Sequence, residues 1–239
     1  MSTSIPIGGL QKTSLIDYPG KVAAVVFTRG CAWRCAYCHN PELTDPAQFD
    51  RSDTVPTAAE VLRFLESRRN QLEGVVISGG EPTLHAGLGD FISKIRAMGF
   101  AIKLDTSGVF PDRLEKLLEA QLLDFIAMDL KAVPEAYPAL VNGPVDPAHL
   151  RRSADLIRNC GLPHEFRTTV LPGFHDPKDL TAIAQWAGDA SPLAFQRFIP
   201  ENACDPAFRQ REAPTLEALQ TLSEEVATAC NRSTPIAVR

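Results

Sequence analysis

Apolar and polar positions alternate along this chain in a way that predicts strands followed by helices. Six short runs rich in β-branched and aromatic residues predict strands, and each is followed by a longer segment with apolar residues at helical spacing. The predicted strands are Val22–Thr28, Gly74–Ser78, Ala101–Thr106, Asp124–Leu130, His164–Leu171 and Leu193–Ile199. The predicted helices are Thr57–Gln71 and the approximate ranges 88–98, 111–120, 147–160, 176–187 and 214–230.

This alternation predicts the fold class. Strands that alternate with helices are typical of parallel sheets joined by right-handed crossovers. Six units are too few for a closed eight-fold barrel of about 250 residues. We therefore predict an α/β fold, a partial (β/α)6 TIM-like barrel that is open on one side, with a doubly wound sheet as the alternative. Residues 1–239 are expected to form one domain, with residues 1–20 as an N-terminal extension.

Polar or glycine-rich sequence follows each predicted strand. In parallel α/β folds the carboxyl ends of the strands open on one face, and active sites lie there. The strand exits are Arg29-Gly30-Cys31, Gly79-Gly80-Glu81-Pro82-Thr83, Asp105-Thr106-Ser107-Gly108, Met128-Asp129-Leu130-Lys131, Val170-Leu171-Pro172-Gly173 and Gln196-Arg197.

The first exit leads into a cluster of cysteines. Cys31, Cys35 and Cys38 lie within eight residues, and soft thiolates suit iron–sulfur clusters, zinc and monovalent copper. Three ligands can hold three irons of a four-iron cluster and leave the fourth iron open. The alternatives are a C-x-x-C-H haem attachment ending at His39, a zinc site that includes His39, and plain core cysteines. The iron–sulfur cluster is the favoured interpretation.

Composition and charge narrow the class of protein and its expected compartment. Hydrophobic residues make up 44% of the chain, charged residues make up 22%, and the net charge is −5, as in an ordinary globular protein. The absence of a basic run argues against nucleic-acid binding. No apolar segment is long enough for a membrane span, and no signal peptide is visible, so we expect a cytoplasmic protein with reduced thiols. The remaining cysteines, Cys160, Cys204 and Cys230, are expected to be small core residues.

Two of these motifs resemble those of the radical S-adenosylmethionine superfamily. The spacing of Cys31, Cys35 and Cys38, with Tyr37 before the last cysteine, resembles the cluster signature, and Gly79-Gly80-Glu81-Pro82 is similar to the GGEP motif. The resemblance implies an oxidoreductase with one 4Fe–4S cluster, whose open iron binds S-adenosylmethionine and cleaves it to a 5′-deoxyadenosyl radical. It places Tyr37 against the adenine. It also implies that the segment Gly79, Gly80 and Glu81 accepts hydrogen bonds from the methionine ammonium.

Other segments resemble the activases of glycyl radical enzymes. They are Cys38-His39-Asn40-Pro41, Asp105-Thr106-Ser107-Gly108, Met128-Asp129-Leu130-Lys131 and Arg167-x-x-Val170-x-Pro172-Gly173. The resemblance implies a cofactor pocket that includes Asp105, Ser107, Asp129, Lys131 and Arg167. Oxygen atoms of Asp105, Thr106, Met128 and Asp129 would suit a small cation site. The alternative for Asp129 and Lys131 is a surface ion pair of little energetic weight.

Two segments indicate the partner. The opening Gly8–Gly20 and the late Gln196-Arg197-Phe198 resemble the longer activating proteins of anaerobic ribonucleoside-triphosphate reductase. The resemblance implies a glycyl radical enzyme as protein substrate and a one-electron donor such as flavodoxin or ferredoxin. It assigns no separate catalytic side chain. The alternatives are a radical enzyme that acts on a small molecule and an electron-transfer iron–sulfur protein with a fourth ligand such as Cys204.

Overall fold

The computed structural model describes residues 5–49 and 55–239, which form two compact units. The first unit comprises Met1–Ala32 and Asn40–Ile126, and the second comprises Trp33–His39 and Ala127–Arg239. The boundary therefore crosses the cysteine loop, with Cys31 in the first unit and the other two cysteines in the second. The assignment of the whole chain to one domain stays a prediction.

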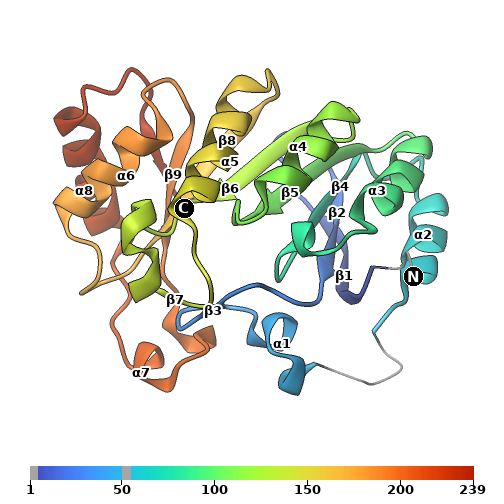
Figure 1. The fold of residues 1–239 in the computed structure, drawn as a ribbon, viewed down its shortest axis with the longest axis horizontal. Helices are drawn as coiled ribbons and strands as arrows, with labels where there is room; N and C mark the ends of the chain where they lie inside the picture. The colour runs from blue at the N-terminus through green and yellow to red at the C-terminus, as the bar shows by residue number, and fades with distance from the viewer. Residues whose placement is uncertain (1–4, 50–54) are drawn as a thin grey trace. The chain divides into compact units, whose positions relative to one another are not determined.

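The strands of the first unit lie in the order β1-β2-β4-β5 (Figure 1). Their bounds are β1 Ile7–Ser14, β2 Ala23–Thr28, β4 Gly74–Gly79 and β5 Ala101–Thr106. β2, β4 and β5 run parallel, whereas β1 pairs antiparallel with β2. The helices are α1 Pro41–Thr44, η1 Pro46–Gln48, α2 Ala58–Glu66, η2 Pro82–Leu84, α3 Leu88–Ala97 and α4 Pro111–Glu119.

Burial on both faces explains the apolar runs of this sheet. Val26, Ile77 and Leu104 are fully buried on neighbouring parallel strands. Tyr18, in the turn after β1, packs with Val25 into a second buried cluster. Strands of a parallel sheet that are covered on both faces read as continuous apolar runs, which is why they were visible in the sequence.

The first helix of this unit begins as predicted. The Thr57 hydroxyl accepts from the backbone N–H of Glu60, and the Glu60 carboxylate accepts from the backbone N–H of Thr57. This capping box satisfies two N–H groups that have no partner within the helix. α2 ends at Glu66 and not at Gln71, because the polar residues that follow form turns.

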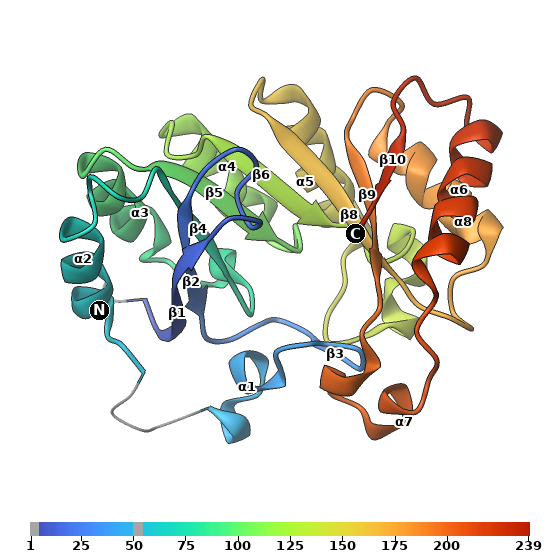
Figure 2. The ribbon, with the colours of Figure 1, turned by 180° about the vertical axis from the view of Figure 1, so that it is seen from behind.

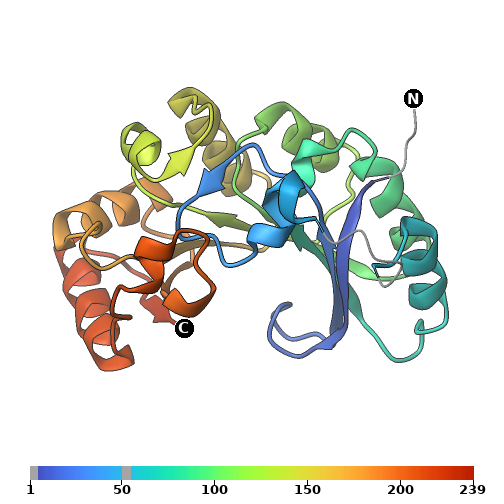
Figure 3. The same cartoon turned by 90° about the horizontal axis from the view of Figure 1, so that it is seen from below.

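The strands of the second unit lie in the order β6-β8-β9-β10 (Figure 2), and a short ribbon pairs β3 with β7 (Figure 1). The bounds are β3 Arg34–Cys35, β6 Phe125–Asp129, β7 Val141–Asn142, β8 His164–Val170, β9 Leu193–Arg197 and β10 Ile236–Val238; β6 starts in the last two residues of the first unit. The helices are η3 Pro134–Ala139, α5 Pro147–Asn159, α6 Pro177–Ala187, η4 Pro200–Asn202, α7 Pro206–Arg209 and α8 Leu216–Ala229. α6 and α8, orange to red in Figure 3, pack together.

The six predicted strands and six predicted helices are all present, and the α/β class with mostly parallel strands is confirmed. β1 and β10 were not predicted. β1 contains two glycines and three exposed polar residues, so it lacks a clear apolar alternation. No helix within the described ranges is long and apolar enough to cross a membrane.

The strand registers align the polar exits inside each unit. In the first unit Thr28 at the end of β2 lies opposite Gly79 at the end of β4. In the second unit Val170 at the end of β8 lies opposite Arg197 at the end of β9. Each unit therefore presents neighbouring strand exits at one edge of its own sheet.

Candidate active site

The cysteine loop is anchored by the second unit. The Trp33 ring is fully buried, donates from Nε1 to the carbonyl of Pro144 at 2.8 Å, and contacts the Tyr137 ring at 5.5 Å between centroids. Cys35 pairs with Val141 in the β3–β7 ribbon, and its carbonyl accepts from the backbone N–H of Cys38 at 3.0 Å. These contacts place Cys35 and Cys38 on a fixed turn.

The donor set of this loop suits a cluster. All six cysteines of the described chain are reduced thiols. Cys35 is 8% exposed, and burial raises the pKa of its thiol against the opposing charge of Lys131. Among the described residues, no three His, Cys, Asp or Glu side chains are arranged around a single metal ion. The fit to an iron–sulfur cluster rests on three soft thiol ligands within one short loop.

The Tyr37 ring is buried within the second unit. Its ring is 6% exposed, lies 6.5 Å from the Phe208 ring of α7, and has the Lys131 ammonium 5.6 Å from its centroid. Burial raises the pKa of the phenol, which keeps it neutral. The predicted contact with adenine stays a prediction.

The Gly79-Gly80 turn requires glycine at both positions. Gly79 has φ +126°, and a side chain there would lie 2.3 Å from the backbone of Thr28. A methyl group on Gly80 would lie 2.1 Å from the carbonyl oxygen of Gly30. The same Gly30 carbonyl accepts from the backbone N–H of Glu81 at 2.8 Å. Close backbone approach therefore joins this turn to the segment just before Cys31.

The Glu81 carboxylate is fully buried and binds within its own unit. Its Oε1 accepts from the backbone N–H of Thr83 at 3.0 Å, from the Thr83 hydroxyl, and from the Thr106 hydroxyl at 2.8 Å. Its Oε2 accepts from the backbone N–H of Ser107 at 2.7 Å and from the Ser107 hydroxyl at 2.5 Å. Glu81 thus joins the exits of β4 and β5. A contact of this loop with the methionine ammonium stays a prediction.

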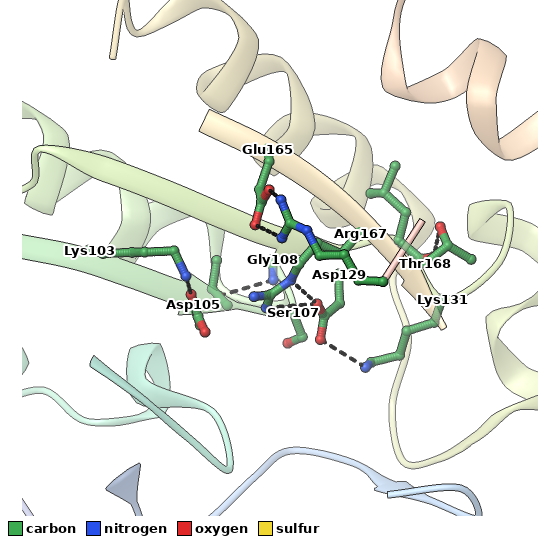
Figure 4. A network of polar contacts seen from close by, with 12 residues as sticks. Lys103, Asp105, Ser107, Gly108, Asp129, Lys131, Glu165, Arg167 and Thr168 are labelled. Atoms are coloured by element: carbon green, nitrogen blue, oxygen red, sulfur yellow. Dashed lines mark hydrogen bonds and ion pairs between the residues drawn. The ribbon is translucent and has the colours of Figure 1, made fainter. Parts of the chain in front are cut away.

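Asp105 has a partner that the sequence analysis missed. The buried Lys103 ammonium lies 2.5 Å from Oδ1 of Asp105, and both side chains point to the same side of β5 (Figure 4). The two-residue spacing within Ala101–Thr106 could have indicated this pair, because alternate strand residues share a face.

Asp129 receives two cations from the second unit, as Figure 4 shows. Nε and Nη2 of Arg167 lie 3.0 and 2.9 Å from Oδ1, and Nζ of Lys131 lies 3.6 Å from Oδ2. The Arg167 and Lys131 side chains are 14% and 15% exposed, whereas the Asp129 side chain is 37% exposed, so this ion pair is half-buried. Burial opposes the charge on Asp129, but Arg167 and then Lys131 outweigh it and lower the pKa of the carboxyl. Burial likewise opposes the charge on Lys131, but the neighbouring groups, the Asp129 carboxylate among them, outweigh burial and raise its pKa.

The remaining candidate residues are Arg197 and three cysteines outside the cysteine loop. Arg197 is exposed and donates from Nε to the carbonyl of Pro214 at 2.8 Å. Cys160 and Cys230 are partly exposed at the ends of α5 and α8, so the expectation of core cysteines is wrong for them and, on the same ground, for Cys204. Cys204 is also partly exposed, and the next residue, Asp205, donates its backbone N–H to Ala36 of the cysteine loop at 2.8 Å.

Comparison with known proteins identifies the family. A family model described as the radical SAM superfamily matches residues 25–187. The chain belongs to the radical SAM superfamily. It is therefore a radical SAM enzyme whose cofactors are a 4Fe–4S cluster and S-adenosylmethionine, as predicted.

Relatives place the chain in one branch of this superfamily. It is 32% identical over 223 residues to the "Putative glycyl-radical enzyme activating enzyme MJ1227" of Methanocaldococcus jannaschii, with 91% of this chain and 90% of that protein covered. It is 26% identical over 243 residues to a pyruvate formate-lyase-activating enzyme of Listeria monocytogenes, with 95% and 94% covered. The predicted branch, the activases of glycyl radical enzymes, is confirmed.

Solved structures of radical SAM proteins share the fold. Streptococcus suis SuiB matches with a TM-score of 0.67 at 14% identity over 88% of this chain and 47% of that one. A structure of anSMEcpe with bound AdoMet matches with a TM-score of 0.60 at 14% identity, over 88% and 61%. The chain spans about half the length of SuiB. These matches confirm the predicted fold class, a partial α/β barrel.

Proposed function

We propose that this radical SAM activase generates a glycyl radical on anaerobic ribonucleoside-triphosphate reductase. The observation that supports the activase chemistry is the surroundings of Lys131. This residue acts electrostatically on Cys35 of the cysteine loop and forms an ion pair with Asp129, so within the second unit two predicted cofactor-binding residues lie beside a predicted cluster ligand. The partner is inferred from the Gly8–Gly20 segment, which forms β1 and its turn, and from Gln196-Arg197-Phe198.

Each predicted residue has a role in this proposal. Cys31, Cys35 and Cys38 bind three irons of the cluster. The S-adenosylmethionine pocket is formed by Tyr37, Gly79, Gly80, Glu81, Asp105, Ser107, Asp129, Lys131 and Arg167. When bound, the cluster and S-adenosylmethionine supply the electron and the 5′-deoxyadenosyl radical that removes a hydrogen atom from the partner's glycine.

The protein's own groups bind and orient the cofactor. The ionised Asp129 carboxylate accepts hydrogen bonds from the ribose hydroxyls, and the Lys131 ammonium binds the methionine carboxylate. A flavodoxin or ferredoxin provides the electron. No side chain acts as an acid or base, so we expect the residues above to affect binding and orientation and not proton transfer.

The test is an anaerobic assay with purified partners. The chain is reconstituted with iron and sulfide, reduced, and mixed with S-adenosylmethionine and anaerobic ribonucleoside-triphosphate reductase. The proposal expects a glycyl radical doublet on the reductase by electron paramagnetic resonance and an equivalent amount of 5′-deoxyadenosine. Cys35→Ala should lose the cluster absorbance and the radical, whereas the matched variant Cys160→Ala should keep both.

Pyruvate formate-lyase is the second candidate partner, because the Listeria relative that covers 95% of this chain is named for it. The same assay with pyruvate formate-lyase decides between the two. A doublet on the lyase alone would replace the proposed partner and keep the activase function. Cleavage of S-adenosylmethionine with a doublet on neither would favour a small-molecule substrate.

A further inference from the structure

A buried tyrosine ring and a half-buried histidine ring hold the backbone just after β6. The Tyr137 hydroxyl accepts from the backbone N–H of Lys131 at 2.9 Å and donates to the carbonyl of Asp129 at 3.3 Å. On the other side, Nε2 of His175 lies 2.9 Å from the carbonyl oxygen of Lys131. A carbonyl only accepts hydrogen bonds, so Nε2 of His175 carries a proton and donates it.

The other ring nitrogen of His175 is also engaged. The backbone N–H of Leu171 donates to Nδ1 at 3.0 Å. Nδ1 must therefore be unprotonated, and the two bonds together fix one tautomer of a neutral imidazole. His175 thus links the exit of β6, at Lys131, to the exit of β8, at Leu171.

The backbone between these two rings has its remaining polar groups satisfied by β8. The N–H of Leu130 donates to the carbonyl of Arg167 at 2.8 Å, and the carbonyl of Leu130 accepts from the Thr168 hydroxyl at 2.9 Å. Both bonds would remain if His175 were changed. The Lys131 carbonyl would instead lose its bond to His175, so His175 fixes this end of the segment.

The surroundings of His175 favour the neutral ring. Burial lowers the pKa of the imidazole, and the bond to the Lys131 carbonyl and the charge of Asp179 on α6 oppose this shift only in part. The Phe174 ring covers one side, with 5.0 Å between centroids. The charged group that acts on the ring is Asp179 from α6, whereas Lys131 contacts the ring through its backbone carbonyl and directs its ammonium to Asp129.

We propose that neutral His175 is a positioning residue for S-adenosylmethionine binding, because it fixes the Lys131 backbone and so holds the Lys131 ammonium between Asp129 and the Tyr37 ring. This inference rests on the proposed role of Asp129 and Lys131 in binding the cofactor. Protonation of Nδ1 would place two donors, that nitrogen and the Leu171 N–H, against each other. Acidification would then release the β8 exit and loosen the Lys131 backbone.

Two substitutions separate the two hydrogen bonds of the ring. The amide N–H of Gln in His175→Gln reaches the position of Nε2 and can still donate to Lys131. The amide oxygen of Asn in His175→Asn reaches the position of Nδ1 and can accept from Leu171 but leaves the Lys131 carbonyl unpaired. His164→Gln is the control, because His164 bonds Leu162 and Ser191 in the same unit.

The measurement is equilibrium binding of S-adenosylmethionine to the reconstituted protein with its cluster oxidised, so that no turnover occurs, between about pH 5.5 and 8. We expect His175→Asn to weaken binding roughly five- to tenfold, and His175→Gln to stay within about twofold of the unmodified protein. The unmodified protein should bind less tightly as the pH falls below the ordinary histidine range, and His175→Gln should lose that dependence. Near-ultraviolet circular dichroism checks that each variant is folded.

The results separate this inference from the proposed function. Equal affinities and equal pH profiles for all four proteins, in a chain that binds S-adenosylmethionine and activates its partner, would overturn the positioning role alone. If the Asn variant does not fold, the pH profile of the Gln variant still decides. Failure of the unmodified, cluster-loaded protein to bind S-adenosylmethionine would overturn the proposed function and this inference together.

Discussion

Replacing Glu81 by Gln tests the buried network that joins the exits of β4 and β5. The carboxylate accepts five hydrogen bonds, two of them from the backbone N–H groups of Thr83 and Ser107. An amide has one accepting oxygen, so its NH₂ group must face one of those two backbone donors. The hydroxyl groups can rotate to accept from the amide, but a backbone N–H cannot.

The expected cost follows from this geometry. One buried backbone N–H without a partner costs about 1–3 kcal/mol, and the other bonds lose the assistance of a negative charge. We therefore expect Glu81→Gln to lower the free energy of unfolding by about 2–4 kcal/mol. This is a large share of the roughly 5–15 kcal/mol that stabilises an ordinary protein.

Urea unfolding followed by far-ultraviolet circular dichroism measures this loss. Both tryptophans, Trp33 and Trp186, belong to the second unit, so their fluorescence reports that unit separately. The control is Glu119→Gln on the exposed side of α4, which should change stability by less than about 0.5 kcal/mol. If Glu81→Gln is as stable as this control, the five hydrogen bonds do not carry the weight assigned to them.

Three further predictions concern the same strand exits. Gly80→Ala would bring a methyl group to within 2.1 Å of the Gly30 carbonyl oxygen, so it should lower the free energy of unfolding by about 3 kcal/mol or more. Thermal unfolding measures this loss, and a midpoint temperature near that of the unmodified protein would contradict the close approach. Tyr137→Phe removes the partner of the Lys131 N–H and should cost about 1–3 kcal/mol, with faster hydrogen exchange at that amide as the specific sign. Burial lowers the pKa of each of three histidines, which are His39, His85 and His175. The unfolded chain therefore binds more protons than the folded chain below about pH 6.5, and stability should fall from there as the pH decreases. A urea midpoint that stays constant between about pH 7 and 5 would show that these rings are not buried as neutral groups.

Much of the chemistry could be predicted from local sequence. The cysteine spacing and Gly79-Gly80-Glu81 are contiguous motifs, so their residue types alone point to a cluster and a close backbone turn. The side-chain partners could not be predicted in the same way. Lys103 was passed over although it lies two residues before Asp105, and the Arg167 partner of Asp129 could not be predicted because it comes from another strand.

The element pattern and the family are what the sequence determined by itself. Continuous apolar runs such as Ala23–Thr28 predict buried parallel strands, because both faces of such strands are covered. The edge strand β1 was missed because it is stabilised by pairing with β2 and not by its own apolar pattern.

Only the tertiary structure decided which groups fix the backbone at Lys131. His175 had no assigned role, since a single histidine after a strand exit gives no local signal. The structure brings its two ring nitrogens to the Lys131 carbonyl and the Leu171 N–H, which lie 44 and 4 residues away in the chain. Such partners are fixed by how strands and loops pack and not by neighbouring residue types, so the sequence determined the chemistry of this protein while tertiary packing decided its positioning.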